Sequence, residues 1–185
     1  MSQKNSSTSV PNTMETDEAN LPPLSLKDFG VYNRLAAQME QFHNHFRLAW
    51  NDLQNACGAT GKRSGGLKPK QLVITGLRFC SQLDFHHRIE EDHIFPVLAR
   101  KMPEFKQKQT LLAQHKKIHH GLAQLEEYLG KCRSGEDDLE LVEMKRLMDA
   151  FGEVLWEHLD EEVQTLRAEN MRKYWTLDEM RTLPM

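Results

Sequence analysis

Apolar residues recur at helical spacing through four long segments of this chain, and no other feature of the sequence limits the fold as strongly. The segments run from about 31 to 55, 69 to 102, 103 to 129 and 139 to 171. In each segment, apolar residues three and four positions apart fall on one face of a helix, and no strand-like alternation competes with them. Four such helices joined by three connections predict an all-α fold, an up-down-up-down four-helix bundle.

The composition of the two ends differs from that of the four segments. Residues 1–24 are rich in Ser, Asn, Thr and Pro, which predicts a disordered N-terminal tail. The bundle is expected over residues 25–171, and residues 172–185 are expected to form a short C-terminal extension that packs on the bundle.

Two prolines mark the expected helix boundaries. Pro96 is expected to bend the second helix, because it lacks an amide hydrogen and its ring clashes with the preceding turn. Pro103 suits the first turn of the third helix, where an amide hydrogen has no helical partner.

Charge and composition exclude several classes of function. The 185 residues carry a net charge of −3, which gives no basic footprint for nucleic acid. No apolar run approaches the ~20 residues of a membrane span, and the N-terminus has neither the apolar core of a signal peptide nor the composition of a transit peptide. Cys57, Cys80 and Cys132 are widely spaced, which is typical of reduced thiols in the cytoplasm, with the nucleus as an alternative.

Polar residues on the apolar faces indicate the chemistry. Residues four apart lie one above the other on a helix. His115 and His119 in "HKKIH" stand in this relation beside the apolar face of the third helix, and His158 and Glu162 do so in the fourth. On the first helix, His43 is the histidine closest to the apolar line.

The second helix offers two registers for such a pair. Its apolar line passes through Leu72, Phe79, Leu83, Ile94 and Val97. Glu90 falls on this line and His86 about 40° to one side of it, whereas His87 and Glu91 average about 80° to the other side. His86 and Glu90 are therefore the predicted pair, and we expect a variant without His86 to lose a metal that a variant without His87 keeps.

A lone histidine on an apolar face is usually a hydrogen-bonded core residue, and an isolated i,i+4 pair is a weak signal. Four helices that all bring such groups to their buried faces are a stronger one, because burying them without a cation is costly. The predicted metal ligands are His43, His86, Glu90, His115, His119, His158 and Glu162. Mixed nitrogen and oxygen ligands in this number favour two ions, iron first and manganese second, over a four-ligand structural zinc.

Four motifs resemble those of one protein family. The segment "HKKIH" followed by "HGLAQL" is similar to the third-helix motif of hemerythrins, and "HHRIEEDHIFPVL" and "EHLDEEV" resemble the HxxxE segments of the His-His-Glu hemerythrin-like family. The segment "FHNHFR" resembles the first-helix motif, so the resemblance covers about residues 30 to 170.

The resemblance implies a hemerythrin-like bundle with a non-haem di-iron centre, bridged by two carboxylates and an oxo or hydroxo group and held by the same seven residues. It implies a protein that binds or senses dioxygen or a related ligand such as nitric oxide or peroxide, or that handles iron. Oxygen-carrying hemerythrins end with His and Asp five apart, while this chain has HxxxE at His158 and Glu162. The departure favours a sensor or iron-handling role over oxygen storage.

Two alternatives stay open. The ExxH spacings Glu40–His43 and Glu90–His93 match those of ferritin-like di-iron oxidases, which would make the protein an oxidase or ferroxidase. The other alternative is a metal-free helical interaction module that docks a protein partner through Tyr174 and Trp175.

Overall fold

The computed structural model describes residues 21–58, 68–106 and 110–184, and these residues form helices and connections without a strand. The helices are α1 (Leu26–Tyr32), α2 (Arg34–Gly58), α3 (Pro69–Ile89), a π-helix (Glu90–Ile94), α4 (Phe95–Leu98), a 3₁₀ helix (Pro103–Phe105), α5 (Thr110–Ser134), α6 (Leu141–Thr165), α7 (Ala168–Tyr174) and α8 (Leu177–Thr182). The predicted disordered tail falls largely on residues outside this description. The all-helical prediction is confirmed for the described residues.

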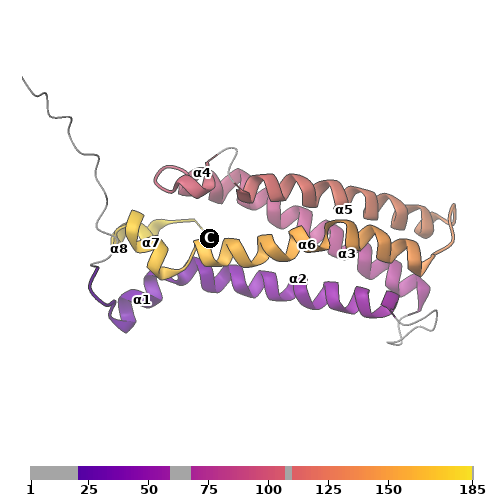
Figure 1. Ribbon diagram of the computed structural model, residues 1–185, viewed down its shortest axis with the longest axis horizontal. Coiled ribbons are helices and arrows are strands. Elements are labelled where there is room, and N and C mark those ends of the chain that lie inside the picture. Colours follow the sequence, from indigo (N-terminus) through magenta and orange to yellow (C-terminus); the bar gives the residue numbers. More distant parts are fainter. Residues whose placement is uncertain (1–20, 59–67, 107–109, 185) are drawn as a thin grey trace, which may run out of the picture.

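The long helices α2, α3, α5 and α6 lie side by side and form a helical bundle (Figure 1). Helix α2 packs against α3 and α6, and α5 packs against the same two helices. Three glycines, Gly76, Gly121 and Gly152, allow close approach between these helices. At Gly152, for example, an added Cβ would lie 2.9 Å from the Trp50 ring, so α2 and α6 meet too closely there for any larger residue.

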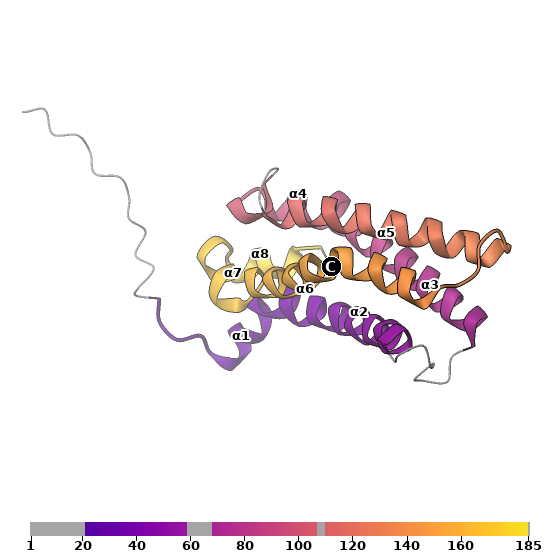
Figure 2. The same cartoon turned by 45° about the vertical axis from the view of Figure 1, so that its right-hand side comes forward.

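The short helices α1, α7 and α8 gather at one end of the bundle, as two views agree (Figures 1 and 2). Both α7 and α8 pack against α1. The Arg34 guanidinium, at the start of α2, donates to the carbonyls of Met180 (2.8 Å) and Leu183 (3.1 Å). These bonds tie the end of the chain to the beginning of the bundle.

Several helix boundaries differ from the predicted ones. The fourth segment is interrupted, because Arg167 is extended (φ −64°, ψ 155°) and α7 begins after it. The Asn33 side chain accepts a hydrogen bond from the Ala168 amide (3.3 Å), which satisfies a donor that the break exposes. Pro103 opens a separate 3₁₀ turn instead of the first turn of α5.

The helix that contains Pro96 changes its winding before this proline. Residues Glu90–Ile94 form a π-helix, and the Phe95 amide donates to the Glu90 carbonyl five residues earlier. Because a proline ring clashes with the carbonyl four residues before it, a wider turn at this position is physically reasonable. The expected irregularity at Pro96 is therefore a π-bulge placed directly beside the predicted ligands.

The buried apolar residues form two clusters, one toward the α2–α3 loop and one toward the α1, α7 and α8 end. On α2, Met39 belongs to one cluster and Phe46 to the other, with His43 between them. On α6, Leu159 and Val163 belong to different clusters and Glu162 lies between them in the chain. A polar layer thus divides the apolar core at one level of the bundle.

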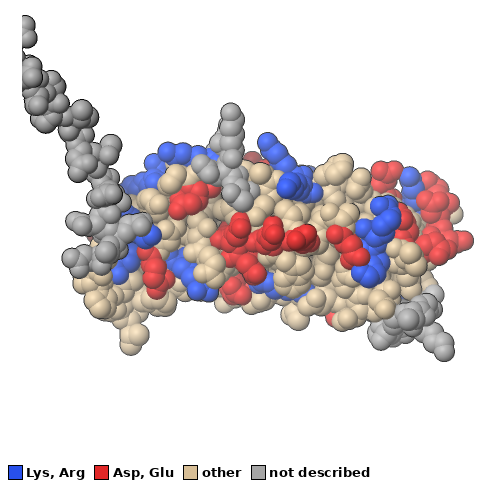
Figure 3. Space-filling view, viewed as in Figure 1, with Lys and Arg blue, Asp and Glu red and all other residues tan. Residues whose placement is uncertain are grey.

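The surface is mixed in charge on the face drawn in Figure 3. Acidic side chains cross the middle of this face, and Lys and Arg are interspersed among them without forming one basic patch. No helix among the described residues is long and apolar enough to cross a membrane.

Candidate metal centre

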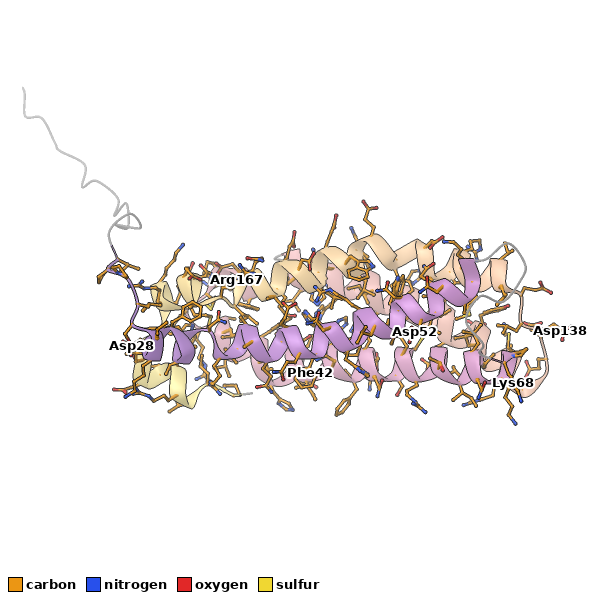
Figure 4. All side chains as sticks on the ribbon, turned by 90° about the horizontal axis from the view of Figure 1, so that it is seen from below. Asp28, Phe42, Asp52, Lys68, Asp138 and Arg167 are labelled. Carbon is orange, nitrogen blue, oxygen red and sulfur yellow. The ribbon has the colours of Figure 1, made fainter. Side chains whose placement is uncertain are left out.

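The polar layer contains most of the residues predicted to bind metal. Six of the seven reach this layer, and each of these residues is at most 8% exposed. They come from the four long helices and from the π-helix. They are His43, His86, Glu90, His115, His158 and Glu162. Phe42, labelled near the middle of α2 in Figure 4, directly precedes His43 and marks the level of the layer. The structure therefore brings six of the seven predicted side chains together.

Each of the two buried carboxylates lies between imidazoles of different helices. Glu90 Oε1 is 2.8 Å from His86 Nε2, and Glu90 Oε2 is 3.6 Å from His115 Nε2. Glu162 Oε2 is 3.3 Å from His43 Nε2 and 3.7 Å from His158 Nε2. Carboxylates placed in this way suit the bridging of two cations.

Two hydrogen bonds fix which ring nitrogen carries the proton. The Leu159 carbonyl can only accept, so the His43 Nδ1–H donates to it (2.9 Å). His115 Nδ1–H likewise donates to the Glu91 carboxylate (2.7 Å). In both rings, Nε2 is left with a lone pair that faces the layer. A metal-binding histidine usually donates its other ring N–H to an acceptor in this way, which orients the ring.

Many polar atoms of the layer have no hydrogen-bond partner. They include His86 Nε2, both ring nitrogens of His87, and both carboxylate oxygens of Glu90 and of Glu162. The short distance between His86 and Glu90 lacks the angles of a hydrogen bond. Within the layer, His115 Nε2 and His158 Nε2 share a hydrogen bond of 3.1 Å. Buried polar groups are almost always satisfied, so the remaining nitrogen and oxygen atoms, which lack hydrogen bonds, fit a bound cation. The residues present therefore suit a metal ion.

Burial keeps the histidines in the neutral form that binds metal. Desolvation is the largest influence on each and lowers the pKa of His86 to about 4 and that of His158 to about 3. It also lowers the pKa of His115, and that of His87 falls well below its usual value. At neutral pH these imidazoles present lone pairs instead of positive charges.

The two carboxylates shift in opposite directions. Burial raises the pKa of Glu90 well above its usual value, and the nearby charges of Glu162 and Glu91 add to the effect. Burial also acts to raise the pKa of Glu162, but the neighbouring imidazoles of His43 and His158 outweigh it, and the pKa is lowered. Two buried carboxylates at one level repel each other unless a cation lies between them.

His87 is the buried residue that sequence reasoning left out. Helical phase favoured His86 over His87 as the metal ligand, yet His87 is also buried, at 0% exposed. Its ring stacks on that of His115 with the centroids 4.0 Å apart, and it contacts His158 edge-on at 5.1 Å. His87, Glu90, His115 and His158 offer ligand atoms within 4.8 Å of one another.

His119 lies at the margin of the layer. Its side chain is 29% exposed, Nδ1 is 3.1 Å from Asp84 Oδ1, and Nε2 is 3.5 Å from Glu91 Oε1. Glu91, His115 and His119 form a further group within ligand distance. Both ring nitrogens of His119 thus face carboxylates, and its role as a metal ligand stays a prediction.

Comparisons with known proteins place this chain in a family. The family model described as "Hemerythrin HHE cation binding domain" matches residues 34–168. The chain is similar to "Dimeric xanthone biosynthesis cluster protein R11" of Cryptosporiopsis sp. (strain 8999), with 30% identity over 155 residues, which are 78% of this chain and 56% of that protein. The chain thus spans about half the length of this relative. No solved structure matches significantly. Because the family model covers the helices that carry the polar layer, the chain belongs to the hemerythrin HHE cation-binding domain family.

Proposed function

We propose that the protein holds two iron ions in the polar layer, with manganese as second choice, and that it binds or senses dioxygen or a related ligand such as nitric oxide or peroxide, or handles iron. The proposal is carried by one observation, the buried nitrogen and oxygen atoms that face one another without hydrogen-bond partners. Membership of the family supports the binding of a cation.

Two ions suit the way in which the side chains group. His43, His86 and Glu90 form one set of atoms within ligand distance, and His87, Glu90, His115 and His158 form another. Because Glu90 belongs to both sets, we propose it as a bridge between the ions. Glu162, which is grouped with His43 and His158, is the proposed second bridge.

When bound, such a pair of irons would supply a redox-active Lewis acid to a small ligand. The chain's own residues set the surroundings. His43 and His115 are oriented by the Leu159 carbonyl and by Glu91. Apolar clusters lie on both sides of the layer, with Phe46 in one and Phe95 in the other, and give it a largely apolar surrounding.

The two alternatives are less well supported. A ferritin-like site would use Glu40 and His93, but Glu40 is 46% exposed and lies 3.5 Å from Arg47, and His93 is exposed. A metal-free module that docks through its aromatic tail would need Trp175 at the surface, and this residue is only 7% exposed. The Cryptosporiopsis relative is named for a biosynthetic cluster, so we keep an enzymatic role beside sensing.

We further propose an up-and-down course of the four long helices, and residence in the cytoplasm or the nucleus. The packing of α2 and α5 on the same two neighbours supports the first proposal. The three cysteines are free, which supports a reducing compartment.

Metal analysis of protein purified in air, combined with its absorption spectrum, tests the function. We expect about two irons per chain, as in other di-iron helical bundles, and charge-transfer absorption in the near ultraviolet. The adjacent acids Glu162 and Glu161 provide a matched pair, because Glu162 is buried and Glu161 is exposed. Glu162→Ala should lose most of the iron and Glu161→Ala should keep it. Stoichiometric zinc without iron, or equal iron in both variants, would contradict the proposal.

A further inference from the structure

A pocket of about 460 Å³ opens between α2 and α3, beside the polar layer. Most of its walls are apolar, and three phenylalanines, Phe42, Phe46 and Phe85, lie among them with Met39. Phe42 and Phe85 are 48% and 64% exposed, so these rings stand at the mouth instead of in the core. Exposed phenylalanines that border a cavity are costly to leave in water, and this favours a ligand that covers them.

The inner part of the pocket belongs to the proposed metal centre. His86 and Glu90 line it, and both are at most 8% exposed. His86 Nε2 and both Glu90 oxygens have no hydrogen-bond partner. These three atoms are buried, so a molecule that fills the pocket lies against the two residues and reaches an oxygen of Glu90 when that side chain shifts toward the pocket.

The size of the pocket decides which class of ligand it suits. A diatomic ligand needs about the volume of one water molecule, roughly 30 Å³. Pockets for organic ligands measure about 300–1,000 Å³ and combine apolar walls with a few placed polar groups. At about 460 Å³, this pocket falls within the second class.

The shape of the walls favours rings over flexible chains. The rings of Phe42 and Phe46 lie 5.5 Å and 5.1 Å from the His86 ring, tilted by 42° and 48°. Aromatic groups at such distances and tilts offer offset and edge contacts to a further flat ring. The Met39 thioether adds a soft contact that aromatic rings also favour.

We propose that this pocket binds a flat aromatic molecule that carries a hydroxyl group, with the ring between Phe42 and Phe85 and the hydroxyl donating to Glu90. Both oxygens of a carboxylate and the carbonyl oxygen of a protonated carboxyl group can accept, so Glu90 accepts this hydrogen bond with or without a bound cation. Binding of the organic molecule is inferred from the geometry of the pocket alone, whereas its position beside iron rests on the proposed function.

The probes are 2-naphthol and 2-methoxynaphthalene, which share a fused ring system and differ in the hydroxyl donor. Binding is measured by calorimetry on iron-loaded protein and on chelator-treated protein. We expect 2-naphthol to bind in both states, about tenfold more tightly than the methoxy compound, since a hydrogen bond to a buried carboxyl group is worth about that much. In the iron-loaded protein, 2-naphthol should also change the near-ultraviolet absorption.

The variants exploit exposed side chains, whose loss should leave the fold intact. Phe42→Ala combined with Phe85→Ala should weaken 2-naphthol binding by about tenfold, because two aromatic contacts are lost. The matched control combines Leu48→Ala with Ile74→Ala, which removes exposed apolar side chains from α2 and α3 outside the pocket. The control should bind 2-naphthol as the parent protein does, and thermal melts should show both variants folded.

The remaining outcomes either overturn the inference or separate it from the proposed function. Absence of 2-naphthol binding, or equal weakening in both double variants, would overturn it. Binding of 1-decanol in preference to 2-naphthol would show a pocket for chains and would overturn the aromatic assignment. If the protein holds iron but binds no naphthol, only this inference fails. If it binds naphthol but holds no iron, only the proposed function fails.

Discussion

The imidazoles of His87 and His115 lie nearly parallel, with their centroids 4.0 Å apart and their planes inclined by 14°. Two imidazolium cations would repel each other at this distance, and burial lowers the pKa of both residues. Both rings are therefore neutral at pH 7. Since neither ring nitrogen of His87 has a hydrogen-bond partner, this residue has a lone pair available for a cation.

The burial of His87 beside His115 changes which α3 variant is expected to lose iron. We now expect His87→Ala to lose a substantial part of the iron, because a buried ligand would be replaced by a cavity. His93→Ala is the control, since His93 lies on the same helical segment but is exposed. Iron per chain is measured after purification from iron-rich medium. A His87→Ala protein with the iron content of the His93→Ala control would exclude His87 from the site.

The stability of the metal-free protein should fall as the pH is lowered. The pKa of His158 is about 3 and that of His86 about 4, against about 6.5 in an unfolded chain. Between these values the unfolded state binds protons that the folded state does not, so the free energy of unfolding rises with pH. Between its folded and unfolded pKa values, each of these histidines changes the free energy of unfolding by up to about 1.4 kcal/mol per pH unit.

Glu90 acts in the opposite sense. Its raised pKa means that the folded state keeps a proton that the unfolded state releases above about 4.5. This carboxylate therefore reduces stability as the pH rises from about 4.5 toward its folded pKa. Urea denaturation of chelator-treated protein between pH 4 and pH 7 measures the combined effect of these groups on the free energy of unfolding. In Glu90→Gln, stability should depend more steeply on pH than in the parent, whereas an unchanged dependence would refute the assignment.

The π-helix explains why the register of α3 could be predicted only in part. A single apolar line from Leu72 to Val97 assumes regular α-helix, but the winding changes at Glu90, and residues beyond it no longer share the phase of α3. Val73 and Cys80, which were not counted, are buried. They move the centre of the buried face by roughly 30° toward His87. Adding these residues to the line would have revealed His87 from the sequence.

Other features were predictable because they depend on local spacing. The i,i+4 pair His158 and Glu162 is buried as expected, since α6 is regular throughout this stretch. The break at Arg167 was not predictable from periodicity. It depends on Asn33, which is distant in the sequence and accepts from the Ala168 amide. Tertiary hydrogen bonds of this kind leave no repeating pattern.

Arg34 should hold the C-terminal helix in place. Its guanidinium donates to the carbonyls of Met180 and Leu183, which lie within α8 and directly after it. Arg34→Ala should cost about 1–3 kcal/mol, because two hydrogen bonds from a charged donor are lost. Trypsin cleavage at Arg181, followed by mass spectrometry, should be faster in this variant.

The control for Arg34 is Arg172→Ala, which removes a partly buried arginine that donates to the Pro22 carbonyl (2.8 Å) and not to α8 among the described residues. Arg172→Ala should leave the cleavage rate at Arg181 close to that of the parent protein. Arg34→Lys should behave like Arg34→Ala, because the lysine side chain is one atom shorter and its Nζ does not reach the position of the single Nη2 atom that donates to both carbonyls. Full protection in Arg34→Lys would show that charge alone holds α8.

Two glycines of α5 should respond to the same substitution with opposite signs. A Cβ added at Gly121 would lie within 3.0 Å of three atoms of the buried Phe151 on α6, whereas one added at Gly130 would meet nothing within 4 Å. Gly121→Ala should therefore cost about 1–3 kcal/mol through overpacking. Gly130→Ala should add about 0.5–1 kcal/mol, because alanine loses less backbone entropy in a helix than glycine does.

Thermal melts with a chelator present remove any contribution of the metal, and the melting temperature should shift by about 2–4 °C per kcal/mol. The variant Gly121→Ala combined with Phe151→Leu should recover part of the loss if the ring is the obstacle. Equal shifts for the two single variants would show that the contact between α5 and α6 at Gly121 is looser than described.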